Sequence, residues 1–232
     1  MQEYIIPKNR FSGFYHFKEV SSTMDKAIEF IEKGVRKGIV VADSQSGGYG
    51  RNGKSWFSAD NGNLYLSFFE KLDRSEPLNF IPQRTALSAQ MAVKKFVDTG
   101  NVSIKWPNDI LIDMKKCAGI IAKTVQRGFD RFYVCGIGIN VFMPETDLFE
   151  HNWKVGAVNE YIPDITTESV LIELIKQLEM FTQMSESDIK EKYVSQISWM
   201  TDRSITYTIN GTDIRTGIAA GFNEDGSVIK IS

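Results

Sequence analysis

The sequence contains few of the residues that build metal centres, disulfides or nucleophilic triads. Its 232 residues include two histidines, His16 and His151, and two cysteines, Cys117 and Cys135. The histidines are far apart and have no cysteine at ligand spacing, so no metal-ligand cluster is visible. Neither histidine has a neighbour that would mark a Ser–His or Cys–His pair. Both cysteines lie in apolar runs, which favours buried, reduced thiols and a cytoplasmic location.

The sequence also lacks long hydrophobic runs and an excess of charge. No apolar run is long enough to span a bilayer, and the first residues do not have the pattern of a signal peptide. The formal net charge is -2, so nothing in the overall charge attracts nucleic acid or an acidic membrane. A hydrophobic content of 42% is ordinary for a soluble globular protein. These features predict a globular chain that binds neither nucleic acid nor membrane.

Glycine and positive charge are concentrated between Ser44 and Trp56. Exposed backbone N–H groups in such a stretch form a cradle for anions, and glycine lets the backbone approach a ligand closely. Arg51 and Lys54 add positive charge, and Trp56 offers a flat face for an aromatic ring. The glycines of this loop are Gly47, Gly48, Gly50 and Gly53. The loop is suited to a phosphate with a base attached, although an ordinary flexible hairpin loop is the alternative.

The segment from Gly48 to Ser55 fits the P-loop pattern G-x-x-x-x-G-K-[ST]. A P-loop requires a helix that opens directly after the pattern. Here the turn signal Asp60–Asn63 and the strand-like run Leu64–Phe69 follow instead. The sequence therefore argues against a P-loop.

Short strands and two helices account for the first part of the chain. Ser22 and Asp25 fit a capping box for a helix that ends at Gly34 or Gly38. Pro82 begins a second helix, which Gly100 closes. The predicted strands are 14–17, 39–42, 64–69, 102–105, 110–112, 117–124 and 132–142. Tight turns between them predict an α+β fold with a mixed, largely antiparallel sheet.

The rest of the chain reads as two helices followed by a small β unit. Thr166 or Thr167 caps the third helix, and a fourth begins near Ser187. From Met200 the pattern alternates through about three strands, with a hairpin signal at Asn210–Gly211. Three strands are marginally stable alone, so this tail is expected to dock on the main domain. The predicted domains are 1–199 and 200–232.

Four blocks together identify a resemblance. They are 45–56 (QSGGYGRNGKSW), 105–109 (KWPND), 116–121 (KCAGII) and 136–140 (GIGIN). In order and spacing they resemble those of biotin protein ligases, the biotin–[acetyl-CoA-carboxylase] ligases. The resemblance implies an α/β catalytic domain related to lipoate ligases and a small C-terminal SH3-like domain.

The resemblance implies an ATP-dependent enzyme with Mg²⁺ as cofactor. Biotin's carboxylate would attack the α-phosphorus of ATP to give biotinyl-5′-AMP. A lysine of a biotin carboxyl carrier domain of a biotin-dependent carboxylase would then take the biotinyl group. The pattern starts close to the first residue, so a DNA-binding repressor domain is not expected, and a homodimer is compatible with the family.

The resemblance also assigns residues. Lys116 and Arg51 would be catalytic. Biotin would contact Ser22, Thr23, Gln45, Tyr49, Arg51, Lys116 and Gly119. ATP or the adenylate would contact Gly48, Gly50, Arg51, Lys54, Trp56, Lys105, Asn108 and Asn140. Asn108 and Asp109 would lie near Mg²⁺, which takes oxygen ligands.

Each assignment has a simpler alternative. Ser22 and Thr23 could be plain helix caps, Lys116 a solvated lysine, and Trp56 a core residue. The loop also departs from the family's Gly-Arg-Gly-Arg-x-Gly-Arg pattern, because Tyr49 and Lys54 replace two arginines. The competing functions are a lipoate or octanoate ligase on the same fold, whose usual motif is absent here, and a non-catalytic adaptor with a degenerate site.

Overall fold

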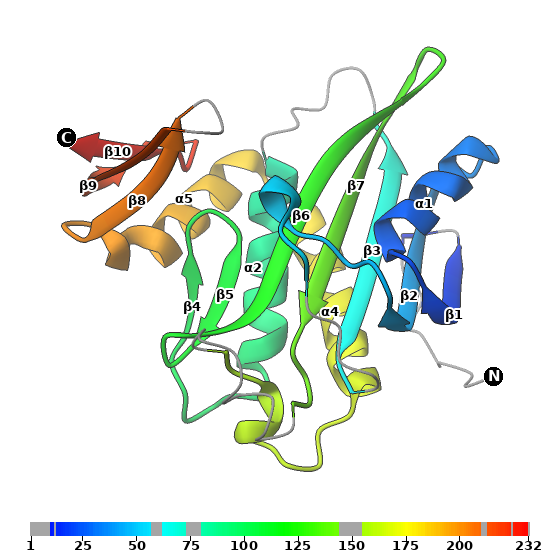
Figure 1. Ribbon diagram of the computed structural model, residues 1–232, viewed down its shortest axis with the longest axis horizontal. Helices are drawn as coiled ribbons and strands as arrows, with labels where there is room; N and C mark the ends of the chain where they lie inside the picture. The colour runs from blue at the N-terminus through cyan, green and yellow to red at the C-terminus, as the bar shows by residue number, and fades with distance from the viewer. Residues whose placement is uncertain are drawn as a thin grey trace.

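A seven-stranded sheet is the centre of the computed structural model, which describes residues 10–11, 13–56, 62–72, 80–143, 155–209, 213–223 and 225–231 (Figure 1). The strand order is β1-β2-β3-β7-β6-β5-β4. The edge strand β1 runs parallel to β2, and all other neighbours are antiparallel. The bounds are β1 Phe14–Val20, β2 Lys37–Gln45, β3 Leu64–Lys71, β4 Val102–Lys105, β5 Asp109–Ile112, β6 Lys115–Arg127 and β7 Asp130–Ile139. The mixed, largely antiparallel sheet is confirmed.

Helix α1 (Thr23–Glu32) covers one face of this sheet. The Ser22 side chain caps the helix by accepting a hydrogen bond from Met24 N at 3.2 Å. Gly34, with φ +91°, ends it as predicted, because glycine tolerates this left-handed backbone. The predicted capping box is wrong in both halves, because Ser22 accepts from Met24 N rather than from Asp25 N. The Asp25 carboxylate accepts a hydrogen bond from the Tyr49 hydroxyl instead of completing the box.

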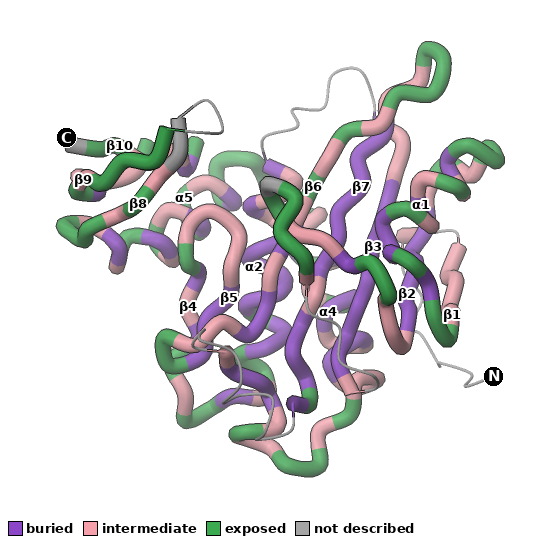
Figure 2. The backbone as a smooth tube through the Cα atoms, in the orientation of Figure 1, coloured by how far each residue is buried: buried purple, intermediate pink, exposed green. Residues whose placement is uncertain are grey.

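Three helices cover the opposite face: α2 (Phe80–Lys94), α4 (Thr167–Thr182) and α5 (Glu186–Ile197). The Thr166 side chain caps α4 by accepting from Ser169 N. The apolar residues of these helices pack on the large cluster formed by alternate residues of the strands. Figure 2 shows this buried layer as purple tube through the strands and helices, with exposed segments at the loops.

The predicted limits of α2 are wrong at both ends. The helix includes Phe80, ahead of Pro82, and it ends at Lys94 rather than at Gly100. Phe96 N bonds to Val93 O, an i→i+3 contact that turns the chain out of the helix. Gly100 serves close packing, since a Cβ there would lie 2.6 Å from Val97 Cγ1 and 2.8 Å from Tyr161 Cε1.

A separate three-stranded antiparallel sheet follows α5 and the 3₁₀ turn η3 (Ser198–Met200). Its strands are β8 (Ser204–Ile209), β9 (Asp213–Phe222) and β10 (Val228–Ile231), in the order β10-β9-β8. The three predicted strands and their docking are confirmed, because Trp106 Nε1 donates to Gly226 O at 2.8 Å. These strands form a sheet and do not by themselves close a barrel.

Some predictions fall outside the described residues. They concern His151, the hairpin residues Asn210 and Gly211, and the residues before Arg10. The division into 1–199 and 200–232 stays a prediction. Within the described part of the chain, every helix is too short or too polar to cross a membrane.

Candidate active site

A β-bulge at Cys117 decides which side chains of β6 face α1 and the glycine loop. Asp109 pairs with Gly119 and Ile110 with Ala118, but Leu111 pairs with Lys116, so Cys117 is an extra residue. In a regular strand, Lys116 and Gly119 would point to opposite faces. The bulge reverses the alternation, so both residues lie on the same face as Asp109. Lys105 pairs with Asp109 across the β4–β5 hairpin and belongs to this face as well.

The floor of the site is a strip of glycines on β6 and β7. Gly119 pairs with Gly138, and the indole of Trp56 lies directly on both. A Cβ on Gly119 would be 2.6 Å from the Trp56 ring, and one on Gly138 would be 2.5 Å from it. The Trp56 Nε1 atom is buried and has no hydrogen-bond partner among the described residues. Trp56 therefore covers the surface of Gly119 that the resemblance assigns to biotin, and a ligand there requires the indole to move.

The start of α1 forms one wall. Gln45 Oε1 accepts hydrogen bonds from Thr23 N at 2.8 Å and from Thr23 Oγ1 at 3.1 Å. Thr23 Oγ1 is also 2.8 Å from Ser67 Oγ on β3. Ser22, Thr23 and Ser67 are buried, although buried polar groups cost free energy unless they are paired. This network joins two predicted biotin contacts, Thr23 and Gln45, and the third, Ser22, is the adjacent cap residue of α1.

The glycine loop lies across this face as a short hairpin. Trp56 N bonds to Gly48 O, Gly50 N bonds to Lys54 O, and Tyr49 pairs with Ser55. Between them, Arg51–Gly53 form one 3₁₀ turn, η1 (Figure 1). Arg51 and Lys54 are exposed. Ser55 and Trp56 do not begin a helix, so the argument against a P-loop is confirmed.

Two cations meet the predicted metal ligands. Lys116 Nζ is 2.7 Å from Asp109 Oδ1, and Arg51 Nη1 donates to Asn108 Oδ1 at 3.0 Å. Lys116 Nζ also lies 5.2 Å from the centre of the Trp56 ring. The described residues contain no group of three metal-ligating side chains, and both predicted oxygens face a positive charge. This arrangement does not fit a resident Mg²⁺ site, although it places Lys116 and Arg51 at one end of the floor.

The turn that carries Asn108 is fixed from several sides. Asn108 Nδ2 donates to Ile120 O at 2.9 Å, and Tyr193 of α5 donates to Pro107 O at 2.8 Å. Burial raises the pKa of Tyr193, and the nearby Arg51 guanidinium partly offsets this. The helix α5 and the small sheet therefore support the turn beneath the glycine loop.

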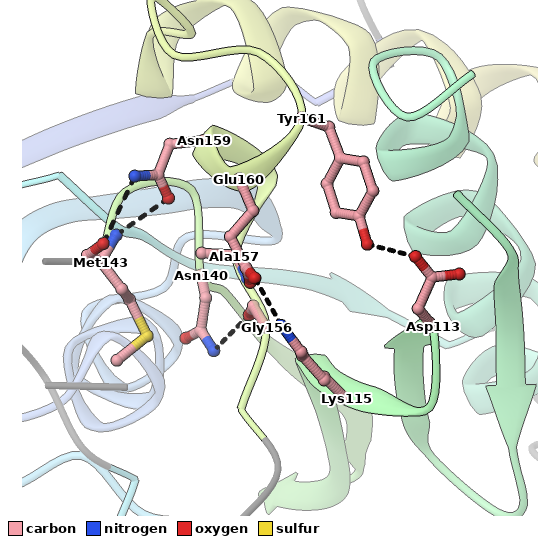
Figure 3. Close-up of polar contacts among 9 residues, drawn as sticks. All are labelled: Asp113, Lys115, Asn140, Met143, Gly156, Ala157, Asn159, Glu160 and Tyr161. Atoms are coloured by element: carbon pink, nitrogen blue, oxygen red, sulfur yellow. Dashed lines mark hydrogen bonds and ion pairs between the residues drawn. The ribbon is translucent and has the colours of Figure 1, made fainter. Parts of the chain in front are cut away.

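Asn140 holds the end of the floor together. Its Nδ2 donates to Lys116 O at 3.3 Å. It also donates to Gly156 O at 3.2 Å (Figure 3). Ala157 N bonds to Glu160 Oε1 in the next 3₁₀ turn, η2 (Val158–Glu160), and Lys115 Nζ is 2.6 Å from Glu160 Oε2. A hydrogen bond from the Tyr161 hydroxyl lowers the pKa of Asp113. The segment from Gly156 to Tyr161 thus fastens the strand that carries Lys116.

Three residues near the site were not predicted. Ser67 is buried, and the sequence signal for it was a polar residue that interrupts the apolar run of β3. Asp25 and Lys123 contact Tyr49; the sequence marked Asp25 only as part of a capping box, and nothing in the pattern marked Lys123. The structure brings together the predicted residues of the glycine loop, α1, the 105–109 turn and β6, and it leaves Lys54 and Lys105 exposed at the margin.

Comparison with known proteins gives one consistent result. A structure of the biotin protein ligase from Aquifex aeolicus in complex with biotin and ATP has a TM-score of 0.76 and 27% identity, and it covers 96% of this chain and 93% of that chain. The bifunctional ligase/repressor BirA of Escherichia coli K12 is 28% identical over 194 residues, 82% of this chain and 60% of that protein. BirA of Bacillus subtilis 168 is 37% identical over 133 residues, 55% of this chain and 40% of that protein.

This chain thus spans 60% and 40% of the length of these two relatives. A family model matches residues 16–140, which include α1, the glycine loop and the strands through the end of β7. The matching family is the Biotin/lipoate A/B protein ligase family, and the chain belongs to it.

Proposed function

We propose that the protein is an ATP-dependent biotin protein ligase. A carboxylate oxygen of biotin attacks the α-phosphorus of ATP, the bond to the β-phosphate oxygen breaks, and pyrophosphate leaves. The amine of a carrier lysine then attacks the acyl carbon of biotinyl-5′-AMP, forms the amide and expels AMP. Neither step needs a nucleophile on the enzyme, so positioning and charge stabilisation carry the catalysis.

The observation that carries this proposal is the position of Lys116 created by the bulge. Its ammonium lies on the same face as Gly119, next to Asp109 and under the glycine loop. A lysine there can stabilise negative charge on the biotin carboxylate and on the α-phosphate as they approach. Arg51, fixed to Asn108 at the same end of the floor, supplies the second cation.

The two ends of the site differ in chemistry, as two substrates require. The buried Ser22, Thr23 and Ser67 hydroxyls suit the neutral, hydrogen-bonding ring of biotin. The exposed end has Arg51 and Lys54, which suit phosphates. Trp56 supplies an aromatic face for adenine once it leaves the glycine strip.

The relatives support biotin and ATP as the substrates. The Aquifex aeolicus structure is a complex with biotin and ATP, and both curated relatives cited above are named bifunctional ligase/repressor BirA. The transfer to a biotin carboxyl carrier domain, the lack of a repressor function, the cytoplasmic location and the homodimer are parts of the proposal. No catalytic step is assigned to Mg²⁺, because Asn108 and Asp109 face cations.

Exchange of labelled pyrophosphate into ATP tests the proposal. We expect exchange with biotin and none with lipoate. Exchange with lipoate alone would assign the chain to the lipoate side of its family. Folded protein that exchanges with neither substrate would support the non-catalytic adaptor and contradict the ligase.

A further inference from the structure

Tyr49 connects the glycine loop to two elements of the main sheet face. Its hydroxyl donates to Asp25 Oδ1 of α1 at 2.8 Å, and it accepts from Lys123 Nζ of β6 at 2.7 Å. The same ammonium lies 5.1 Å from the centre of the Tyr49 ring. The ring packs against the apolar cluster between α1 and the sheet. Tyr49 therefore spans the space between α1 and β6.

The position of Tyr49 within the loop makes this contact important. Tyr49 pairs with Ser55 at the base of the hairpin, and only Gly50 separates it from the η1 turn that carries Arg51. At the same base, Gly47 N bonds to Ser21 O just ahead of α1. The tip has an exposed side-chain contact, between Arg51 and Asn108. Holding the base at Tyr49 thus limits how far Arg51 can move from Thr23 and Lys116.

The cluster of Tyr49, Asp25 and Lys123 needs no ligand to form. Asp25 and Lys123 carry opposite charges, and their charged atoms are 4.0 Å apart, so the cluster adds no net charge to the site. A hydroxyl between a carboxylate and an ammonium makes two charge-assisted hydrogen bonds, which are stronger than neutral ones. The contact can therefore hold the loop before a ligand arrives.

We propose that Tyr49 is a positioning residue, whose hydroxyl fastens the glycine loop to Asp25 and Lys123 so that the loop stays closed over the acyl-adenylate. The loop has one arginine, Arg51, to contact the phosphate. The Tyr49 contact keeps this arginine close to the phosphate, so that the loop is held closed with fewer charges. This inference rests on the proposed ligase function.

The test compares Tyr49→Phe with the wild type in two assays. The first is trypsin cleavage after Arg51 or Lys54 in the ligand-free protein, followed by mass spectrometry. The second is the release rate of preformed biotinyl-5′-AMP. We expect both rates to rise about three- to tenfold, the equivalent of one or two lost hydrogen bonds. Tyr15→Phe is the matched control. It removes the hydroxyl of a tyrosine whose ring stacks on Phe30 of α1, and it should leave both rates unchanged.

Asp25→Asn provides a second route to the same result. It should raise both rates, and the Asp25→Asn/Tyr49→Phe double variant should be no worse than the more affected single variant, because the two changes remove one shared interaction. Wild-type rates in both assays for Tyr49→Phe, or strictly additive effects, would overturn the proposal. If no adenylate forms at all, the ligase function fails, while the cleavage rates still test the Tyr49 contact.

Discussion

Lys116 and Asp109 form an ion pair in which Nζ and Oδ1 are 2.7 Å apart. The oxygen makes no hydrogen bond to the described residues, so the contact is electrostatic. The two side chains are 29% and 20% exposed, and partly exposed pairs contribute little to stability. The pair instead fixes where the Lys116 ammonium lies relative to Trp56 and Gly119.

Replacing Asp109 by asparagine should therefore lower activity more than stability. We expect biotin-dependent pyrophosphate exchange to fall about tenfold, because Lys116 loses the group that orients it. The free energy of unfolding in urea should change by less than about 1 kcal/mol. Unchanged exchange would show that the ion pair has no part in positioning Lys116.

The glycine strip under Trp56 gives a second prediction. In Gly138→Ala the new Cβ would meet Trp56 Cε2 at 2.5 Å and Nε1 at 2.7 Å, so the indole must move away from the sheet. The fluorescence emission of Trp56 should shift to longer wavelength as the ring becomes more exposed to water. The same substitution in a Trp56→Phe background should leave the emission unchanged. An identical shift in that background would mean that another tryptophan responds.

The two buried thiols predict how stability depends on pH. Burial raises the pKa of Cys135 to about 12 and also raises the pKa of Cys117. Above about pH 9 the unfolded chain loses these protons while the folded protein keeps them. Stability should fall with rising pH by about 1.4 kcal/mol per pH unit for each thiol.

Urea unfolding between pH 8 and 10.5 measures this effect. The Cys117→Ala/Cys135→Ala variant should be less stable at pH 8, because it leaves cavities in the core, but its stability should fall less steeply above pH 9. Equal slopes in the wild type and the variant would mean that the thiols ionise in the folded protein as easily as in the unfolded chain.

Much of the fold could be predicted because local patterns and tertiary structure agree. Ser22 caps α1, Gly34 ends it, and Thr166 caps α4, and each effect acts within one helical turn. The end of α2 could not be predicted in the same way. Gly100 looked like a helix terminator, but tertiary packing against Tyr161 explains it.

In the site, too, the features that depend on tertiary contacts could not be predicted from local sequence patterns. The sequence blocks indicated that both Lys116 and Gly119 face the ligand, but strict alternation places them on opposite faces of a strand. The bulge at Cys117 resolves this, and it depends on the pairing of β5 with β6. The contacts of Ser67, Asp25 and Lys123 likewise depend on segments that are distant in sequence.

The central claim is that Lys116 stabilises the charge that develops as biotin is adenylated. Lys115 offers a matched control, because it is the adjacent lysine and contacts Glu160 instead of the site. The decisive measurement is biotin-dependent pyrophosphate exchange by Lys116→Met and Lys115→Met, each checked for folding by circular dichroism. We expect Lys116→Met to lose about 100-fold or more in kcat, while Lys115→Met stays within about threefold of the wild type. Equal losses in the two variants, or full exchange by Lys116→Met, would contradict the claim.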